Sequence, residues 1–139
     1  MDTVFAIADN IITSLGFTSN ENFNALKNNI SGIKQTTDPK ITQVPMYTSI
    51  VDSERLTTEF SKIGNVDDYT RLEKLMILSI NDVLNQTKIN PSQEDTLFIF
   101  SSTKGNIDLL ENPDHDFDLE RINLWALADK VCAFFKSPV

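Results

Sequence analysis

Few residues of this chain are of the types that perform covalent chemistry. Its 139 residues include one cysteine, Cys132, and one histidine, His115. A single cysteine excludes an intramolecular disulfide and any multi-cysteine metal site. Cys132 lies in an apolar stretch with helical spacing, where a thiol packs as a small hydrophobic group. We therefore assign no catalytic residue within the chain.

The acidic segment around His115 holds side chains of metal-ligating type. Asp114-His115-Asp116 is its densest part, between other acids such as Asp108 and Asp118. A closed metal site needs more convergent ligands than such a triplet offers. The segment is predicted to be a solvated loop, and no metal or other cofactor is assigned.

Ser101-Ser102-Thr103-Lys104-Gly105 is a run of small residues that directly follows an apolar stretch. Its place would suit a phosphate-binding loop, but the spacing of glycine, lysine and hydroxyl residues of a P-loop is missing. We interpret it as a tight turn at the carboxyl end of a central strand. Such strand ends border ligand sites in open α/β sheets.

Composition narrows the class of protein. Apolar residues make up 40% of the chain and charged residues 23%, as in ordinary globular proteins. The net charge of −8 opposes binding to nucleic acid or to anionic membranes. No apolar run approaches the roughly 20 residues that span a bilayer. The first residues lack the basic start of a secretory signal, which predicts a cytoplasmic protein.

Three segments are predicted to be strands. Residues 4–13 are rich in β-branched side chains and predict a buried first strand. Residues 46–51 predict a short edge strand after an irregular connection over 33–45. Residues 96–100 form an uninterrupted apolar run, which is typical of a central strand covered on both faces.

Four segments are predicted to be helices. Thr18, with Glu21 three residues later, forms a capping-box pattern before a helix over residues 20–29. Residues 52–63 show weak helical spacing. The clearest patterns cover 68–86 and 119–136. Their predicted apolar faces comprise Phe23, Leu26 and Ile30 in the first helix; Leu72, Leu75, Met76, Ile80, Val83 and Leu84 in the third; and Ile122, Trp125, Ala126, Ala128, Val131, Phe134 and Phe135 in the last.

The order of these pieces resembles the N-terminal part of the β-ketoacyl-(acyl-carrier-protein) synthases, the condensing enzymes of the thiolase fold. Ser14-Leu15-Gly16 is similar to the family's turn after its first strand, and Ser31-Gly32-Ile33 to the end of its first helix. Arg71 opens the long helix and Asp82-Val83-Leu84 closes it. The run from Ser101 to Gly105 and the junction Ser137-Pro138 complete the series.

The resemblance implies an α/β fold: a layered thiolase-like half-fold, a mixed β-sheet with helices packed on it. Residues 1–139 would be the N-terminal part of the domain, ending just before the strand that leads to the nucleophilic cysteine. The implied reaction is decarboxylative Claisen condensation in fatty acid or polyketide/polyene biosynthesis. The family's catalytic Cys-His-His set would lie beyond Val139, so Cys132 inherits no role and the chain alone is expected to be inactive.

The resemblance also implies a site and partners. Thr103 would belong to the substrate pocket, near a subunit interface. A homodimer would form through the region of residues 96–100 and the last helix. The implied partner is an acyl carrier protein, but Val66-Asp67-Asp68 replaces the basic stretch that helps to dock it in many members.

Two other functions remain open from the sequence. The first is a non-catalytic partner subunit of the same family, similar to a chain-length factor. The second is a stand-alone α/β binding or signalling module, such as a receiver-like domain. Such a domain needs clustered acids after its first strand, and Asp9 and Asn10 are the only candidates.

Overall fold

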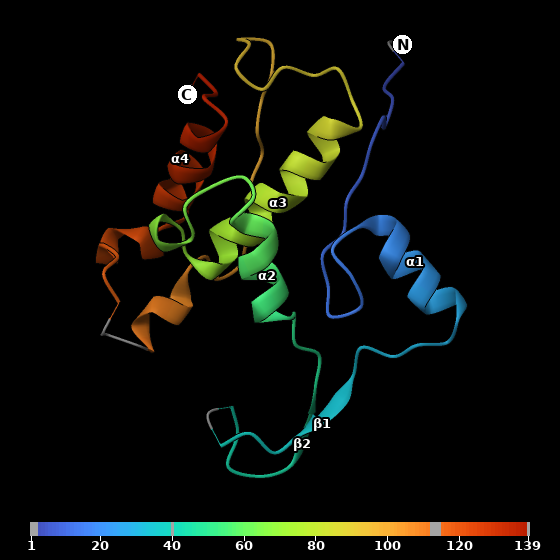
Figure 1. The fold of residues 1–139 in the computed structure, drawn as a ribbon. Helices are drawn as coiled ribbons and strands as arrows, with labels where there is room; N and C mark the ends of the chain where they lie inside the picture. The colour runs from blue at the N-terminus through green and yellow to red at the C-terminus, as the bar shows by residue number, and fades with distance from the viewer. Residues whose placement is uncertain (1–2, 40, 112–114, 139) are drawn as a thin grey trace.

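Helices dominate the architecture of the chain (Figure 1). The computed structural model describes residues 3–39, 41–111 and 115–138. Within them the helices are α1 (Ser19–Lys27), α2 (Ser53–Phe60), α3 (Arg71–Asn85) and α4 (Leu124–Phe134), and the strands are β1 (Lys34–Thr36) and β2 (Met46–Thr48). Single 3-10 turns occupy η1 (Val66–Asp68), η2 (Ile107–Leu110) and η3 (Leu119–Ile122).

The apolar core lies among α2, α3 and α4. Phe60, Ile77, Leu127 and Val131 form one buried cluster, each with at most 1% of its surface exposed. The rings of Tyr69 and Phe134 extend this cluster, because each packs against the ring of Phe60. Burying side chains of this size is the main favourable contribution to folding.

Gly64 allows two of these rings to approach the turn after α2. A methyl group built on Gly64 would lie 3.0 Å from Phe60 Cε1 and 3.1 Å from Phe134 Cε2. Both distances are shorter than ordinary van der Waals contacts. The absence of a side chain at position 64 therefore lets α4 settle against α2.

The N-terminal region is organised by polar contacts. Thr18 caps α1 by accepting a hydrogen bond from the backbone N–H of Glu21. The buried Asn22 amide donates to the carbonyl oxygens of Ile11, Gly16 and Thr18. One side chain thus holds the preceding loop against the helix. In Figure 1, α1 lies to the right of α2, α3 and α4, and the hairpin lies below them.

The strands β1 and β2 form an antiparallel hairpin, with Gln35 opposite Tyr47. The Ser14 hydroxyl donates to the Gly32 carbonyl oxygen at 3.3 Å, which ties the N-terminal loop to the start of the hairpin. A methyl group on Gly32 would lie 2.1 Å from Ser14 Oγ, so this approach requires glycine.

The predicted fold class is wrong. Among the described residues the sheet consists of the two-stranded antiparallel hairpin, not a layered mixed β-sheet of thiolase type. A mixed sheet needs several long strands that pair with one another, whereas β1 and β2 have three residues each. The structure is instead that of a mostly helical small domain.

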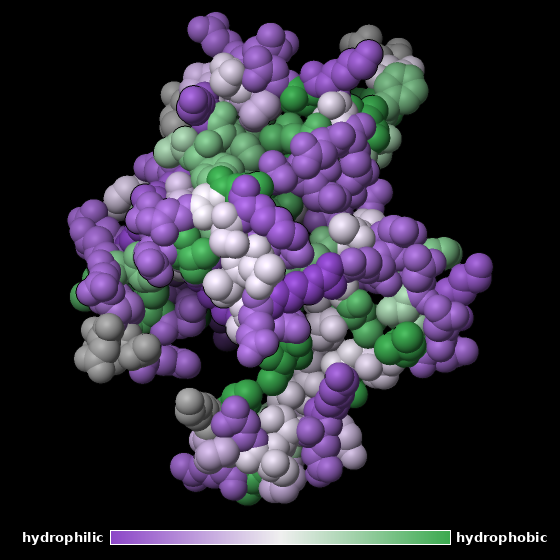
Figure 2. Space-filling model, in the orientation of Figure 1, coloured by the Kyte–Doolittle hydropathy of each residue, from purple (hydrophilic) through white to green (hydrophobic). Residues whose placement is uncertain are grey.

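The predicted first strand over residues 4–13 is extended but is not a buried strand. Val4 is 92% exposed and Phe5 75% exposed, and the segment makes only an isolated bridge, between Thr13 and Gly16. Figure 2 shows apolar residues at the surface in the upper part of the view, where the N-terminus lies in Figure 1. β-branched composition alone does not bury a strand that lacks a paired neighbour.

The predicted central strand over residues 96–100 is also wrong. The segment is extended, but among the described residues no strand pairs with it. Leu97 and Ile99 are more than 80% exposed, while Phe98 and Phe100 are half-buried. One face therefore packs on the protein and the other faces solvent, which an uninterrupted apolar run does not reveal.

The four predicted helices are confirmed, with shorter bounds. The Thr18 cap is confirmed, and the predicted edge strand over 46–51 is confirmed in part as β2. The predicted faces differ more: Phe23 and Leu26 are exposed on α1, Trp125 is exposed on α4, and Ile77 is the fully buried apolar residue of α3. Within the described part of the chain, none of the helices has the length and apolarity to cross a bilayer.

Candidate apolar groove on helix α4

A groove of about 390 Å³ runs between α4 and the extended segment that contains residues 98–102. We call it the α4 groove. Its lining is mainly apolar and comprises Phe98, Ile99, Phe100, Ser102, Leu124, Trp125, Leu127 and Ala128. The volume falls within the roughly 300–1,000 Å³ of small-molecule sites, which are also mainly apolar.

Stacked aromatic rings fix the extended wall of the α4 groove. The Phe98 ring stacks on Phe100 at a centroid distance of 6.0 Å and on Phe135 at 5.9 Å. Phe135 follows α4 directly, so the stack holds residues 96–100 beside that helix (Figure 1). Leu97 and Ile99 alternate with these rings along the extended chain and are exposed to solvent.

The opposite wall comes from the first two turns of α4. Leu127 belongs to the buried core, while Leu124 and Trp125 are about half exposed. Trp125 is the only tryptophan of the chain. The wall therefore combines a rigid base with an exposed aromatic edge.

Thr103, which the resemblance places in a substrate pocket, lies beside the α4 groove but does not line it. Its neighbour Ser102 does. Thr103 is exposed in a turn where the Ser102 hydroxyl oxygen accepts hydrogen bonds from the N–H groups of Lys104 and Gly105. The structure thus has a bend where the tight turn was predicted, but the described residues 96–100 before it are not a strand.

A buried polar network adjoins the groove. Glu73 and Asn106 are fully buried, and Thr70 nearly so. Glu73 Oε1 accepts from Asn106 Nδ2 at 3.1 Å and from Arg121 Nε at 2.9 Å. Glu73 Oε2 accepts from the backbone N–H of Thr70 at 2.9 Å and pairs with Arg121 Nη2. Both carboxylate oxygens therefore have charged or amide donors, as a buried charge requires.

The network joins three parts of the chain. Thr70 and Glu73 form a complete capping box at the start of α3. Asn106 Nδ2 also donates to the Arg121 carbonyl oxygen at 2.8 Å, and the Thr70 hydroxyl donates to Asn106 Oδ1 at 2.7 Å. The Arg121 guanidinium in addition lies over the Phe117 ring. The segment before α4 is thereby attached to α3.

The sequence interpretation missed this network. Thr70-Arg71-Leu72-Glu73 carries the capping-box pattern, with threonine at the cap and glutamate three residues later. That signal was present and would have placed the helix start at Arg71. Nothing in the local sequence indicates that Asn106 and Arg121 complete the network, because they are 33 and 48 residues from Glu73.

Cys132 has the environment of a structural thiol. It is partly buried on α4, and burial, with a smaller effect from Asp129, raises the pKa of its thiol. A raised pKa lowers the fraction of nucleophilic thiolate at neutral pH.

His115 uses both ring nitrogens for local hydrogen bonds. Its Nδ1 accepts from the N–H of Phe117 at 3.2 Å, so Nε2 carries the proton and donates to the Leu109 carbonyl oxygen at 2.9 Å. Asp114, part of the acidic triplet, lies outside the described residues. Among residues 3–39, 41–111 and 115–138, no three side chains of His, Cys, Asp or Glu converge as metal ligands.

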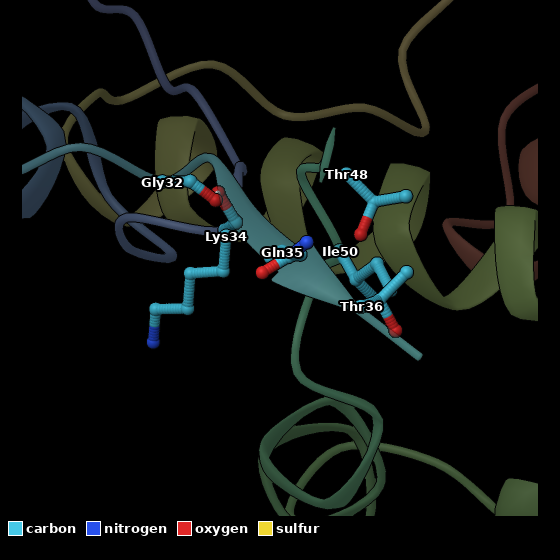
Figure 3. Close-up of a pocket in the computed structure, with 7 residues that line it drawn as sticks. Gly32, Lys34, Gln35, Thr36, Thr48 and Ile50 are labelled. Carbon is cyan, nitrogen blue, oxygen red and sulfur yellow. Dashed lines mark hydrogen bonds between the residues drawn. The ribbon is translucent and has the colours of Figure 1, made fainter. Parts of the chain in front are cut away.

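A second, more polar pocket of about 270 Å³ lies beside the hairpin. Ser14, Thr36 and Thr48 contribute hydroxyl groups to it. Figure 3 shows the Lys34 side chain extending away from the hydroxyls of Thr36 and Thr48. The cation and the hydroxyls thus do not converge, and we assign this pocket no ligand.

Comparison with protein-family models, curated proteins and solved structures finds no match to this chain.

Proposed function

We propose that this chain is part of a β-ketoacyl-(acyl-carrier-protein) synthase-type acyltransferase, in which the α4 groove receives the acyl chain. The observation that carries the proposal is an apolar groove next to Thr103, the residue that the resemblance assigns to the substrate pocket. An acyl chain offers no hydrogen bonds and gains free energy only by leaving water. A lining of aromatic and aliphatic side chains suits such a ligand.

The contact between two motifs that carry the resemblance supports the proposal. Ser14-Leu15-Gly16 and Ser31-Gly32-Ile33 are separated in the sequence but meet through the hydrogen bond from Ser14 to the Gly32 carbonyl. Both glycines lie where a methyl group would overlap neighbouring atoms. The two motifs therefore form neighbouring turns in this chain, and each glycine has a packing role.

The proposal assigns the condensation chemistry to residues outside this chain. Condensation needs a cysteine thiolate to carry the acyl group and histidines to support decarboxylation of the extender. Cys132 does not suit that role, because burial raises its pKa. The purified chain is expected to form no carbon–carbon bond from acyl and malonyl thioesters. Product formation that disappears in Cys132→Ser would contradict this assignment.

Trp125 provides the test of acyl binding, since it lines the groove and is the only tryptophan. Its fluorescence would be titrated with acyl-pantetheine thioesters from butanoyl to dodecanoyl. Each buried methylene stabilises by about 0.8 kcal/mol, which corresponds to roughly a fourfold gain in affinity. We expect that gain per carbon until the groove is filled.

Two variants of α4 make the titration specific. Ala128→Phe fills the groove and should abolish binding, whereas Ala133→Phe adds the same ring at an exposed position that does not line it. Affinity that is independent of chain length, or equal losses in both variants, would refute acyl binding in this groove.

Association of two copies through the same face is part of the proposal. Ile99 and Trp125 line the groove and are exposed, and the exposed Leu97 belongs to the same extended segment. Exposed apolar side chains of this kind mark interaction surfaces. Light scattering at micromolar concentration should show a dimer, and Ile99→Lys should shift it toward monomer. A monomeric parent protein would contradict this part of the proposal.

A further inference from the structure

We propose that Glu73, Asn106 and Arg121 position one wall of the α4 groove and thereby set its affinity for acyl chains. The affinity part rests on the proposed function, whereas the positioning part is a property of the fold. None of the three side chains lines the groove, so they would act through their neighbours.

Asn106 connects Glu73 with Arg121. Its single amide group donates to Glu73 on α3 at 3.1 Å and to the Arg121 carbonyl oxygen at the end of η3 at 2.8 Å. Glu73 in turn binds the Arg121 side chain through both carboxylate oxygens. The loop before α4, the turn η3 and the start of α3 therefore share one fixed point.

Gly105, the residue before Asn106, contacts residues from both walls of the groove. Gly105 precedes Asn106 and has a φ of 57°, and its N–H donates to Ser102 Oγ at 3.0 Å. A methyl group on Gly105 would lie 3.0 Å from Leu124 Cδ2 and 3.1 Å from the Ile122 carbonyl oxygen. Since Ser102 and Leu124 both line the groove, a shift of Asn106 would separate the two walls.

The contacts among Glu73, Asn106 and Arg121 are polar, which favours a role in positioning the groove wall over a role in stability alone. Replacing a buried ion pair by apolar side chains is often neutral or stabilising, so stability alone does not require it. Hydrogen bonds, in contrast, hold their partners at defined distances and angles. Every buried polar side-chain atom of the described residues has a partner, which is the condition for such a network to fix one geometry.

Asn106→Leu and Glu73→Gln test the proposal from the two ends of the same hydrogen bond. Asn106→Leu keeps the approximate volume and removes the amide, and Glu73→Gln removes the charge. Asn85→Leu is the matched control, because Asn85 is exposed at the end of α3. The readouts are dodecanoyl-pantetheine affinity from Trp125 fluorescence, and amide hydrogen exchange of residues 102–110, both well below the unfolding temperature.

We expect both variants to bind the thioester about tenfold more weakly and to exchange faster over residues 102–110, with the helical circular dichroism unchanged. A purely stabilising role would lower the unfolding temperature but leave the affinity of the folded protein as in the parent. That result, or unchanged exchange in this segment, would overturn the proposal. If either variant fails to fold, Thr70→Val removes the hydrogen bond from Thr70 to Asn106, together with the Thr70 cap of α3, and is judged by the same readouts.

The two proposals fail in different ways. A parent protein that binds no thioester of any length refutes the proposed function. The exchange measurement still decides the positioning role in that case. Faster exchange confined to residues 102–110, together with a red shift of Trp125 emission, supports positioning, and unchanged exchange and emission contradict it.

Discussion

The α2–α4 helices and the N-terminal region of α1 and the hairpin are held together by different forces. The helices share a buried apolar cluster to which Phe60, Ile77 and Leu127 each contribute from a different element. The N-terminal region buries Phe17 and Ala25, but depends mainly on the polar contacts of Asn22 and on the ion pair of Glu21 with Arg55.

This difference predicts which region of the molecule unfolds first. Truncating a large buried apolar side chain to alanine lowers the free energy of unfolding by about 2–5 kcal/mol, because the substitution also leaves a cavity. A hydrogen bond contributes about 0.5–1.5 kcal/mol net. The N-terminal region should therefore unfold locally at lower free energy than the α2–α4 helices.

The largest effect is expected from Ile77→Ala. Ile77 is fully buried in the cluster, so truncation should lower the free energy of unfolding by about 2–5 kcal/mol. Urea unfolding followed by circular dichroism measures it. Ile80→Ala is the control on the same helix, because Ile80 is only half-buried and should cost less. Equal costs for the two would mean that the core is placed wrongly.

An intermediate effect is expected from Asn22→Ala. The substitution leaves the carbonyl oxygens of Ile11, Gly16 and Thr18 without this donor, at a cost of about 1–3 kcal/mol. Limited proteolysis should cut the N-terminal loop sooner while α3 and α4 stay protected. The comparison fails if all helices lose protection together. Asn24→Ala, an exposed neighbour on α1, is the control.

The smallest effect is expected from Glu21→Gln. Hydrogen bonds from Arg55 and from the Phe17 N–H lower the pKa of the Glu21 carboxyl. Both side chains of the ion pair are about 40% exposed, so solvent screens it and its contribution should be about 0.2–1 kcal/mol. Thermal unfolding of the variant and the parent at neutral pH measures the difference.

The sign of the pH dependence follows from the lowered pKa. The carboxylate contributes its stability above the ordinary glutamate pKa of about 4.3, and loses it as pH falls through the lower pKa of the folded state. The gap between parent and Glu21→Gln should therefore close in acid. A gap that widens on acidification would contradict the assigned ion pair.

The sequence predicted helices better than strands, for a physical reason. A helix such as α3 satisfies its own backbone and carries its start signal at Thr70. A strand needs a neighbouring strand to pair with, and the sequence of residues 96–100 does not indicate whether such a strand exists. Their five consecutive apolar or β-prone residues predicted burial on two faces, but only the Phe98 and Phe100 side is covered.

The site was predictable only in part. The run of small residues from Ser101 to Gly105 indicated a bend in the chain, and the role of Thr103 in a substrate pocket stays a prediction. The groove itself depends on how α4 meets the extended segment. Trp125 was predicted to be a core residue because it lies three residues from both Ile122 and Ala128, which belong to the predicted apolar face. The pairing of Glu73 with Arg121 is a long-range contact that no local pattern encodes.

A substitution at Gly64 should change the shape of the α4 groove, although Gly64 does not line it. Its missing side chain lets Phe134 rest against the α2 turn, and Phe134 is the last residue of the same helix whose first turns form the wall. Adding one methyl group there would displace the far end of α4 by a few tenths of an ångström and tilt the whole rod. Under the proposed function, Gly64→Ala should thus alter which acyl length binds best without changing a residue that lines the groove, and the thioester series measures this effect.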